Sequence, residues 1–357
     1  MIAMQYIFTF LLTFIFIKLI IKNAKVLGMV DIPNERSSHI KITPRGAGIG
    51  FGFAFFITNL FFNFDLFVEH WIVYLAIFIV FLLGILDDHK DASPKAKFYV
   101  MFLATFILYL DDISIYSLGT FLGVEISLLY FALPFTMIAV AGFTNALNLI
   151  DGLDGLATSV SIVILSSFLY IGYLHSDTFI INLCLTTIVS LFAFLYFNWN
   201  PAKIFMGDSG SLFLGFIIAV VAVLSLEYIH PIAVLYLAAL PLMDTLIVMV
   251  RRIRNGKSPF SPDKTHIHHI LLIFFQKKVR KTVGFLVLLQ IIFSLIGLMF
   301  VGESKVLPFG LGFISLVAFI AINALFYMIF TGMKRRQKLI EKLALRRTRN
   351  KNNKYNL

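Results

Sequence analysis

The sequence predicts an all-α integral membrane protein with about eleven transmembrane helices, an outside N-terminus and a cytoplasmic C-terminus. Of its 357 residues, 59% are hydrophobic and only 14% are charged, whereas a soluble domain carries roughly 25% charged residues. Apolar runs of about 20 residues, the length that crosses a bilayer as a helix, recur along the whole chain. The single cysteine, Cys184, lies inside one of these runs and excludes an intrachain disulfide framework.

The apolar runs define eleven spans in order along the chain. They cover roughly residues 4–22, 47–63, 71–87, 97–111, 129–147, 155–174, 178–197, 209–227, 231–251, 282–301 and 307–331. The first span has no basic residue before it and no small-residue cleavage site after it, while Lys18, Lys22 and Lys25 cluster at its end. This pattern predicts a retained anchor rather than a signal peptide.

The distribution of positive charge predicts the orientation. With the N-terminus outside, 29 of the 30 Lys and Arg residues fall in cytoplasmic segments or at cytoplasmic span ends, and only Lys305 lies outside. Such an asymmetry marks the cytoplasmic side and supports an odd number of spans. The chain then divides into a transmembrane domain, 1–332, and a tail, 333–357, with ten basic residues against Glu341. We expect this tail to rest on anionic lipid rather than to bind nucleic acid.

The segment 145–155, N-A-L-N-L-I-D-G-L-D-G, is the strongest polar motif between apolar runs of membrane length. Two amides and two carboxylates recur at every third residue, namely Asn145, Asn148, Asp151 and Asp154. This spacing predicts a polar stripe on one helical face, and the two glycines allow a turn or the close approach of a ligand. Polar groups beside hydrocarbon are costly unless they bind something. The alternative is a polar helix end that turns at the membrane surface.

Further carboxylates stand at the cytoplasmic ends of other spans. Asp87 and Asp88 follow directly on an apolar run, and adjacent carboxylates repel unless a cation lies beside them or one is protonated. Lys95 and Lys97 follow and could bind phosphate, although a solvated helix end is the alternative. Asp208 lies between glycines where the next span begins, a position that suits an N-cap, a metal ligand or both.

Two cytoplasmic loops add basic and histidine side chains. The first loop carries Arg36, His39, Lys41 and Arg45, which could meet phosphates or act only as topology signals. The last large loop carries Arg252, Asp263, His266, His268 and His269. Three histidines could form a zinc site, but the surrounding bases favour phosphate binding. Asp244, inside the ninth span, predicts a polar contact between helices.

These groups together predict phosphoryl transfer at the cytoplasmic membrane surface. The carboxylates suit Mg²⁺, the basic side chains suit phosphates, and the span walls suit an acyl or prenyl chain. Transfer between a soluble nucleotide and a lipid phosphate needs mainly positioning and neutralisation of charge.

The motifs resemble those of the polyprenyl-phosphate N-acetylhexosamine-1-phosphate transferases. The resemblance runs from about residue 30 to residue 272 and rests on motifs that follow one another on one membrane side. They are D-x-P-N-x-R-x-x-H from Asp31, the Asp87-Asp88 pair, N-x-x-N-x-x-D-G-L-D-G, P-A-K-I-F-M-G-D-S-G-S and S-P-F-S-P-D-K-x-H-I-H-H. The resemblance implies a Mg²⁺-dependent transfer of a sugar-1-phosphate from a UDP-sugar to undecaprenyl phosphate, with release of UMP. The H-I-H-H ending is similar to members that use UDP-GlcNAc.

The resemblance also implies roles for individual residues in a multi-pass enzyme of the bacterial cytoplasmic membrane. The catalytic residues would be Asp87, Asp88, Asp151 and Asp154. The ligands of Mg²⁺, or of Mn²⁺ in its place, would be Asp208 and Asp88. The substrate-binding residues would be Arg45, Lys97, Asn145, Asn148, Arg252, His266, His268 and His269. Direct attack by the lipid phosphate and an aspartyl intermediate both stay open, and family members are often homodimers.

Two alternatives remain at the level of the sequence. A secondary transporter would place ionisable residues near the mid-plane and often shows two repeated halves, whereas here the carboxylates cluster at span ends. The same reaction with another UDP-N-acetyl sugar, such as a deoxysugar or MurNAc-pentapeptide, depends on a few loop side chains. The sequence does not specify the polysaccharide pathway served, whether lipopolysaccharide O-antigen, teichoic acid linkage, capsule or arabinogalactan.

Overall fold

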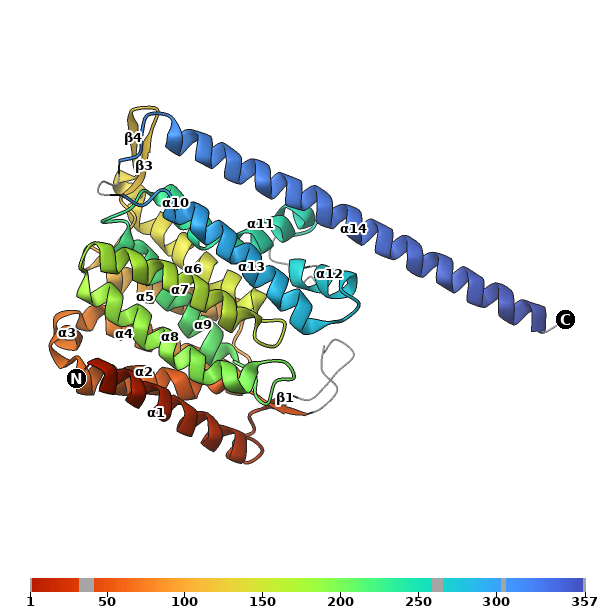
Figure 1. Ribbon diagram of the computed structural model, residues 1–357, viewed down its shortest axis with the longest axis horizontal. Helices are drawn as coiled ribbons and strands as arrows, with labels where there is room; N and C mark the ends of the chain where they lie inside the picture. The colour runs from red at the N-terminus through yellow and green to blue at the C-terminus, as the bar shows by residue number, and fades with distance from the viewer. Residues whose placement is uncertain (1, 32–41, 259–265, 303–305, 356–357) are drawn as a thin grey trace.

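The computed structural model describes residues 2–31, 42–258, 266–302 and 306–355 of the chain, and this part is mostly helical (Figure 1). The helices are α1 (Ile2–Asn23), α2 (Ala47–Phe62), α3 (Phe64–Glu69), α4 (Trp71–Lys90), α5 (Pro94–Tyr109), α6 (Ala132–Ile150), α7 (Leu156–Leu174), α8 (Thr178–Asn198), α9 (Asp208–Ser225), α10 (Pro231–Leu237), α11 (Ala239–Arg254), α12 (Ile267–Phe274), α13 (Val279–Leu298) and α14 (Leu311–Tyr355). Two short hairpins are formed by β1 (Val30–Asp31) with β2 (Thr43–Pro44), and by β3 (Ser117–Phe121) with β4 (Val124–Ser127).

The helical membrane fold is confirmed at a coarser level than the predicted eleven spans. In the described residues, eight helices are long and apolar enough to cross a membrane, or nine if α10 and α11 form one bent span. Helices α2 and α5 have 16 residues each, short of the roughly 20 that cross a typical bilayer. All eleven predicted apolar runs are helical, but the number of crossings and their direction stay predictions.

Helix α9 is the central element of the bundle and contacts α2, α4, α6, α7 and α8. Nearly all of its side chains are buried. Glycines allow its first turn to lie against two neighbouring helices. A Cβ atom on Gly48 of α2 would lie 2.0 Å from the backbone nitrogen of Gly210, and one on Gly84 of α4 would lie 2.6 Å from the Cα of Ser209. The start of α2, the end of α4 and the start of α9 therefore meet at one end of the bundle.

The predicted ninth span is broken rather than continuous, because α10 and α11 meet at an angle of 85°. Pro241 lacks an N–H group and its ring crowds the carbonyl four residues earlier, which is that of Leu237. The side chain of Gln290 on α13 replaces the lost bonds. Its Nε2 donates to the Leu237 carbonyl at 2.7 Å, and its Oε1 accepts from the Leu240 N–H at 3.0 Å. Pro241 therefore accounts for the bend, and Gln290 satisfies the backbone groups that the bend leaves unpaired.

Replacing Gln290 with Leu should destabilise the protein, because two buried backbone groups at the bend would lose their partner. We expect a loss of about 1–3 kcal/mol for each buried polar group left unsatisfied. Thermal unfolding of the purified protein in detergent measures this loss. Leu288→Ala, at an exposed position of the same helix, is the control. An unfolding temperature of Gln290→Leu equal to that of the control would contradict the role of Gln290.

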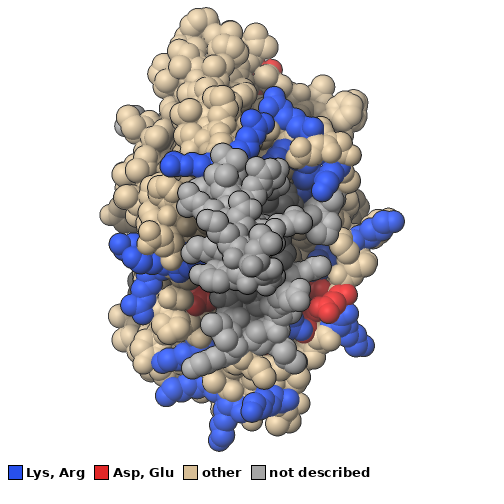
Figure 2. All heavy atoms as spheres, turned by 90° about the vertical axis from the view of Figure 1, so that its right-hand side faces the viewer, with Lys and Arg blue, Asp and Glu red and all other residues tan. Residues whose placement is uncertain are grey.

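The two ends of the bundle differ in secondary structure. The β3–β4 hairpin lies at one end, and β1 and α12 lie at the other (Figure 1). Helix α14 extends past the bundle, so that the backbone of the predicted tail is helical to Tyr355. Figure 2 shows the end with α12, over which Lys and Arg side chains are spread.

Candidate active site

A cavity of about 410 Å³ lies at the end of the bundle where α9 begins. Seven of the residues predicted from the sequence line it: Arg45, Asp88, Asn148, Asp151, Asp154, Asp208 and His269. They come from segments far apart in the chain, which the helix packing described above brings together. The predicted residues that do not line it are Asp87, Lys97, Asn145, Arg252, His266 and His268.

Asp88, at the end of α4, caps α9 from outside the helix. Its Oδ1 accepts from the N–H of Asp208 at 2.8 Å, and its Oδ2 accepts from the N–H of Ser209 at 3.0 Å. The N-cap residue itself is Gly207, which has no side chain to do this. A carboxylate at this position satisfies free N–H groups and complements the helix dipole. Both oxygens of Asp88 therefore accept hydrogen bonds from the backbone of α9. The interpretation of Asp208 as an N-cap is wrong, because Asp208 is the first residue of the helix.

Asp208 is held in the cavity wall by Asn148 of α6. The Asn148 amide donates to Oδ1 of Asp208 and, at 2.7 Å, to the hydroxyl of Ser211. Lys97, in the first turn of α5, forms an ion pair with the buried Asp87, and its Nζ lies 3.8 Å from Oδ1 of Asp208. About a third of the Asp208 side chain remains exposed. Asp208 thus faces the cavity, whereas Asp87 and Lys97 lie outside the cavity lining and form an ion pair beside it.

The predicted polar stripe of the 145–155 segment is wrong, because α6 ends at Ile150. Asn145 and Asn148 are helical, whereas Asp151 and Asp154 lie in a turn, residues 151–155, that Gly155 closes with a φ of +76°. Asp154 fixes the loop before α9, since its Oδ2 accepts from Asn200 at 2.8 Å and from the N–H of Ala202 at 3.0 Å. The turn therefore contributes two carboxylates to the cavity wall.

Burial raises the pKa of Asp151 to about 7, and the neighbouring carboxylates of Asp208, Asp154 and Asp88 add to the rise. Few side chains of this cavity wall oppose that negative charge. A cation bound in the cavity would therefore stabilise the charged form of this carboxylate.

The raised pKa of Asp151 predicts a pH-dependent effect on stability. The folded protein holds this proton up to about pH 7, whereas the unfolded chain releases it near pH 4. Stability is therefore lost as pH rises between these values. In EDTA, Asp151→Asn should unfold a few degrees higher than wild type at pH 8, and at nearly the same temperature at pH 4. Melting both proteins across this range in detergent measures the difference. A difference that does not change with pH would contradict the assignment.

The basic side chains are only partly described. Arg36, His39, Lys41 and Asp263 lie outside the described residues. Arg45 lines the cavity and donates from Nη2 to the backbone carbonyl of Asp88 at 2.8 Å. Arg252, near the end of α11, is buried. The cavity wall thus has one arginine and one histidine, His269, that face the carboxylates.

The predicted contact of Asp244 is confirmed, and its partners are the segment at the start of α12. Asp244 accepts from His266 Nδ1 at 2.9 Å and from the N–H of Ile267 at 2.6 Å. His268 is buried, and burial lowers its pKa to about 3. His269 reaches the cavity from the next position. The sequence predicted the histidines but not that a buried carboxylate holds them.

The structure tests the chemistry of a metal site only through the donor atoms present. Among the described residues, no three His, Cys, Asp or Glu side chains form a group that could hold a metal ion by themselves. The cavity offers carboxylate oxygens of Asp208 and Asp151 and the amide of Asn148, which suit Mg²⁺ better than zinc. These donors fit a hard cation, provided that substrate oxygens or water complete its shell.

Three polar side chains of the cavity wall were not assigned a role from the sequence: those of Asp31, Asn198 and Ser211. Ser211 lies one helical turn after Asp208, so its position could have been inferred from the helix start. Asn198 ends α8 and holds the turn through the N–H of Gly155 at 3.0 Å and the hydroxyl of Thr158. Its contacts are tertiary and have no local signal.

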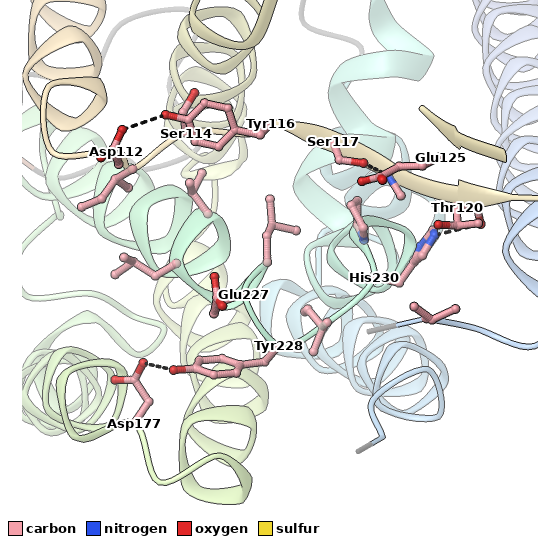
Figure 3. Close-up of a pocket in the computed structure, with 18 residues that line it drawn as sticks. Asp112, Ser114, Tyr116, Ser117, Thr120, Glu125, Asp177, Glu227, Tyr228 and His230 are labelled. Carbon is pink, nitrogen blue, oxygen red and sulfur yellow. Dashed lines mark hydrogen bonds between the residues drawn. The ribbon is translucent and has the colours of Figure 1, made fainter. Parts of the chain in front are cut away.

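A second and larger cavity, about 560 Å³, lies at the opposite end beside the β3–β4 hairpin (Figure 3). Its acidic residues are Asp112, Glu125, Asp177 and Glu227. Asp177 caps α8 by accepting from the N–H of Ile180 at 2.8 Å and accepts from the Tyr228 hydroxyl at 2.9 Å. The motifs of the sequence do not reach this cavity, so the smaller one is the candidate active site.

Comparison with known proteins gives the family. The model of glycosyl transferase family 4 matches residues 70–226, a segment that contains Asp87, Asp151 and Asp208. A protein of Bacillus subtilis (strain 168), named as a probable undecaprenyl-phosphate N-acetylglucosaminyl 1-phosphate transferase, is 36% identical over 273 residues, which cover 74% of this chain and 75% of the relative. The undecaprenyl-phosphate alpha-N-acetylglucosaminyl 1-phosphate transferase of Yersinia pestis is 34% identical over 75% of both chains. That of Escherichia coli (strain K12) is 32% identical over 74% of both chains. The chain therefore belongs to glycosyl transferase family 4.

Proposed function

We propose that the protein transfers GlcNAc-1-phosphate from UDP-GlcNAc to undecaprenyl phosphate, with release of UMP. The observation that carries this proposal is the convergence of Asp88, Asp151, Asp154 and Asp208, from three separate motifs, on one cavity at the end of an apolar helical bundle. The names of the relatives support the transferred group, GlcNAc-1-phosphate, and the acceptor.

The reaction joins the acceptor phosphate to the β-phosphorus of the donor. An oxygen of undecaprenyl phosphate attacks that phosphorus, the bond to the oxygen bridging the two donor phosphates breaks, and UMP leaves with this oxygen. Arg45 lines the cavity and can hold a phosphate oxygen. Lys97, whose Nζ lies 3.8 Å from Oδ1 of Asp208, offsets the negative charge of the carboxylates. Asp151, with a pKa of about 7, can take a proton from the acceptor phosphate. Direct attack by the acceptor needs no covalent intermediate and is the simpler path.

The proposal includes Mg²⁺ as cofactor. When bound, the ion neutralises the charge of the donor diphosphate and of the transition state. Asp208 would hold it, because its carboxylate faces the cavity. Asp88 would act indirectly, because its two oxygens accept backbone N–H groups and thereby fix the position of Asp208.

We further propose eleven crossings of the bacterial cytoplasmic membrane, with this cavity on the cytoplasmic face. The Lys and Arg side chains spread over the end face in Figure 2 support this orientation. A cytoplasmic site also has access to UDP-sugars, which are soluble. The bent α10–α11 pair and the shorter α2 and α5 supply the crossings beyond the eight long apolar helices.

Labelled donor tests the bond that is transferred. UDP-GlcNAc carrying ³²P at the β-phosphorus is incubated with purified protein, undecaprenyl phosphate and Mg²⁺, and the lipid is extracted. We expect the label in the lipid and UMP in solution. Label left in soluble UDP, with sugar in the lipid, would mean glycosyl transfer instead. Parallel reactions with other UDP-N-acetyl sugars test the donor, and a faster reaction with one of these would discard UDP-GlcNAc.

A further inference from the structure

The carboxylate of Asp244 connects two segments that the chain separates by a loop. It lies on α11, beyond the bend at Ala238, and only 1% of its surface is exposed. Its Oδ1 accepts from the N–H of Ile267, the first residue of α12, and its Oδ2 accepts from Nδ1 of His266. Since a carboxylate only accepts, His266 must carry its proton on Nδ1. One buried side chain thus sets both the start of α12 and the tautomer of a histidine.

The same carboxylate faces His268, the most buried histidine of the motif. Nδ1 of His268 lies 3.8 Å from Oδ2 of Asp244, and neither ring nitrogen of His268 has a hydrogen-bond partner among the described residues. The rings of His266 and His268 are nearly parallel, with centroids 5.7 Å apart. A buried ring with two unpaired nitrogens is costly unless a ligand pairs with it.

The other edge of His268 lies against the turn 151–155. A Cβ atom on Gly152 would lie 2.3 Å from Nε2 of His268, so only a glycine allows the ring to approach this closely. Gly152 and the neighbouring His269 both line the cavity. The ring of His268 is therefore fixed between Asp244 on one side and the backbone beside Asp151 on the other.

We propose that Asp244 is a positioning residue that orients the histidines of α12 toward the diphosphate of the nucleotide-sugar donor. The carboxylate holds the Nδ1–H of His266 and the first N–H of α12 in fixed directions. The start of α12 fixed in this way places His268 against Gly152 and His269 at the cavity. The lipid phosphate has no role in this contact. The inference deepens the proposed function and rests on it.

The first test is Asp244→Asn, which keeps the size of the side chain and loses its charge and one acceptor. We expect the KM for UDP-GlcNAc to rise about ten- to hundredfold, while the KM for undecaprenyl phosphate stays within about twofold. Asp177→Asn is the matched control, since Asp177 also caps a helix and accepts from a side chain, but at the opposite end (Figure 3). The control should lose stability and leave both KM values unchanged.

A second variant tests the inference without touching Asp244. Gly152→Ala adds only the methyl group that would displace His268, and the backbone of Gly152 has no positive φ that alanine would strain. It should give the same selective rise in KM for the donor. Gly142→Ala, on α6 with nothing within 4 Å of the added methyl group, should behave as wild type.

Calorimetric titration of the detergent-solubilised variants with UDP-GlcNAc, without lipid, separates this inference from the proposed function. Weaker binding by Asp244→Asn and Gly152→Ala than by their controls supports the inference. Equal binding, or KM values for donor and lipid that rise together in both variants, overturns it. Wild-type protein that binds the donor but forms no UMP would instead overturn the proposed function.

Discussion

Replacing Asp208 with Asn should lower the rate of UMP release at least 10²- to 10³-fold, with the fold retained. The amide oxygen of an asparagine can still accept the bond from Asn148 that now reaches Asp208, so the first turn of α9 keeps its contacts. The negative charge facing the cavity is lost, and with it the group we assign to the cation. Removing one electrostatic contact to a transition state typically has an effect of this size. Initial rates and thermal unfolding of the same preparation measure both quantities.

The control for Asp208→Asn is Asp65→Asn, in the first turn of the short α3 and remote from the motifs. Its rate should equal that of wild type. A rate for Asp208→Asn within about tenfold of wild type, in protein with an unchanged unfolding temperature, would remove Asp208 from the site.

Replacing Gly48 with Ala should inactivate the protein by moving the start of α9. The added Cβ would lie 2.0 Å from the nitrogen of Gly210 and 2.4 Å from the carbonyl carbon of Ser209. These are backbone atoms, which cannot rotate away as a side chain does. Overpacking of this kind lowers the free energy of unfolding by about 1–3 kcal/mol or more. The shift would also move the N–H of Asp208 away from its acceptor, the carboxylate of Asp88. We expect a lower unfolding temperature and a loss of UMP release of about 10²-fold.

The matched substitution for Gly48→Ala is Gly284→Ala on α13, where the added methyl group meets nothing within 4 Å. It should leave the rate unchanged and slightly raise stability, as alanine favours a helix over glycine. Wild-type rates for Gly48→Ala would mean that the contact between α2 and α9 does not position the site.

The apolar runs predicted the helices well, because membrane length and composition are local properties of the chain. The bend after α10 was not predicted, although Pro241 lies at the position that removes the bond to Leu237. Gln290, which satisfies the freed groups, is about fifty residues away, and no local pattern could connect them. The span count depends in the same way on how 16-residue helices such as α2 sit in a bilayer.

The residue types of the site were predictable, but their division of work was not. Clustered carboxylates at span ends, together with the family resemblance, predicted both Asp208 and Asp88 as metal ligands. Only the contact of α4 with α9 shows that both oxygens of Asp88 accept backbone N–H groups. Among the described residues, the carboxylate of Asp208 has no such backbone partner, and it faces the cavity. The polar stripe failed because the helix ends before Asp151. The pairing of Asp244 with His266 likewise follows from tertiary packing and has no sequence signature.

The most direct test of the account is a count of products from purified protein given undecaprenyl phosphate and UDP-GlcNAc. We predict UMP and lipid-linked GlcNAc phosphate in equal amounts with Mg²⁺, and neither with EDTA. Release of UDP in place of UMP, or product formation that continues in EDTA, would contradict the proposed metal-dependent transfer of a sugar-1-phosphate at this cavity.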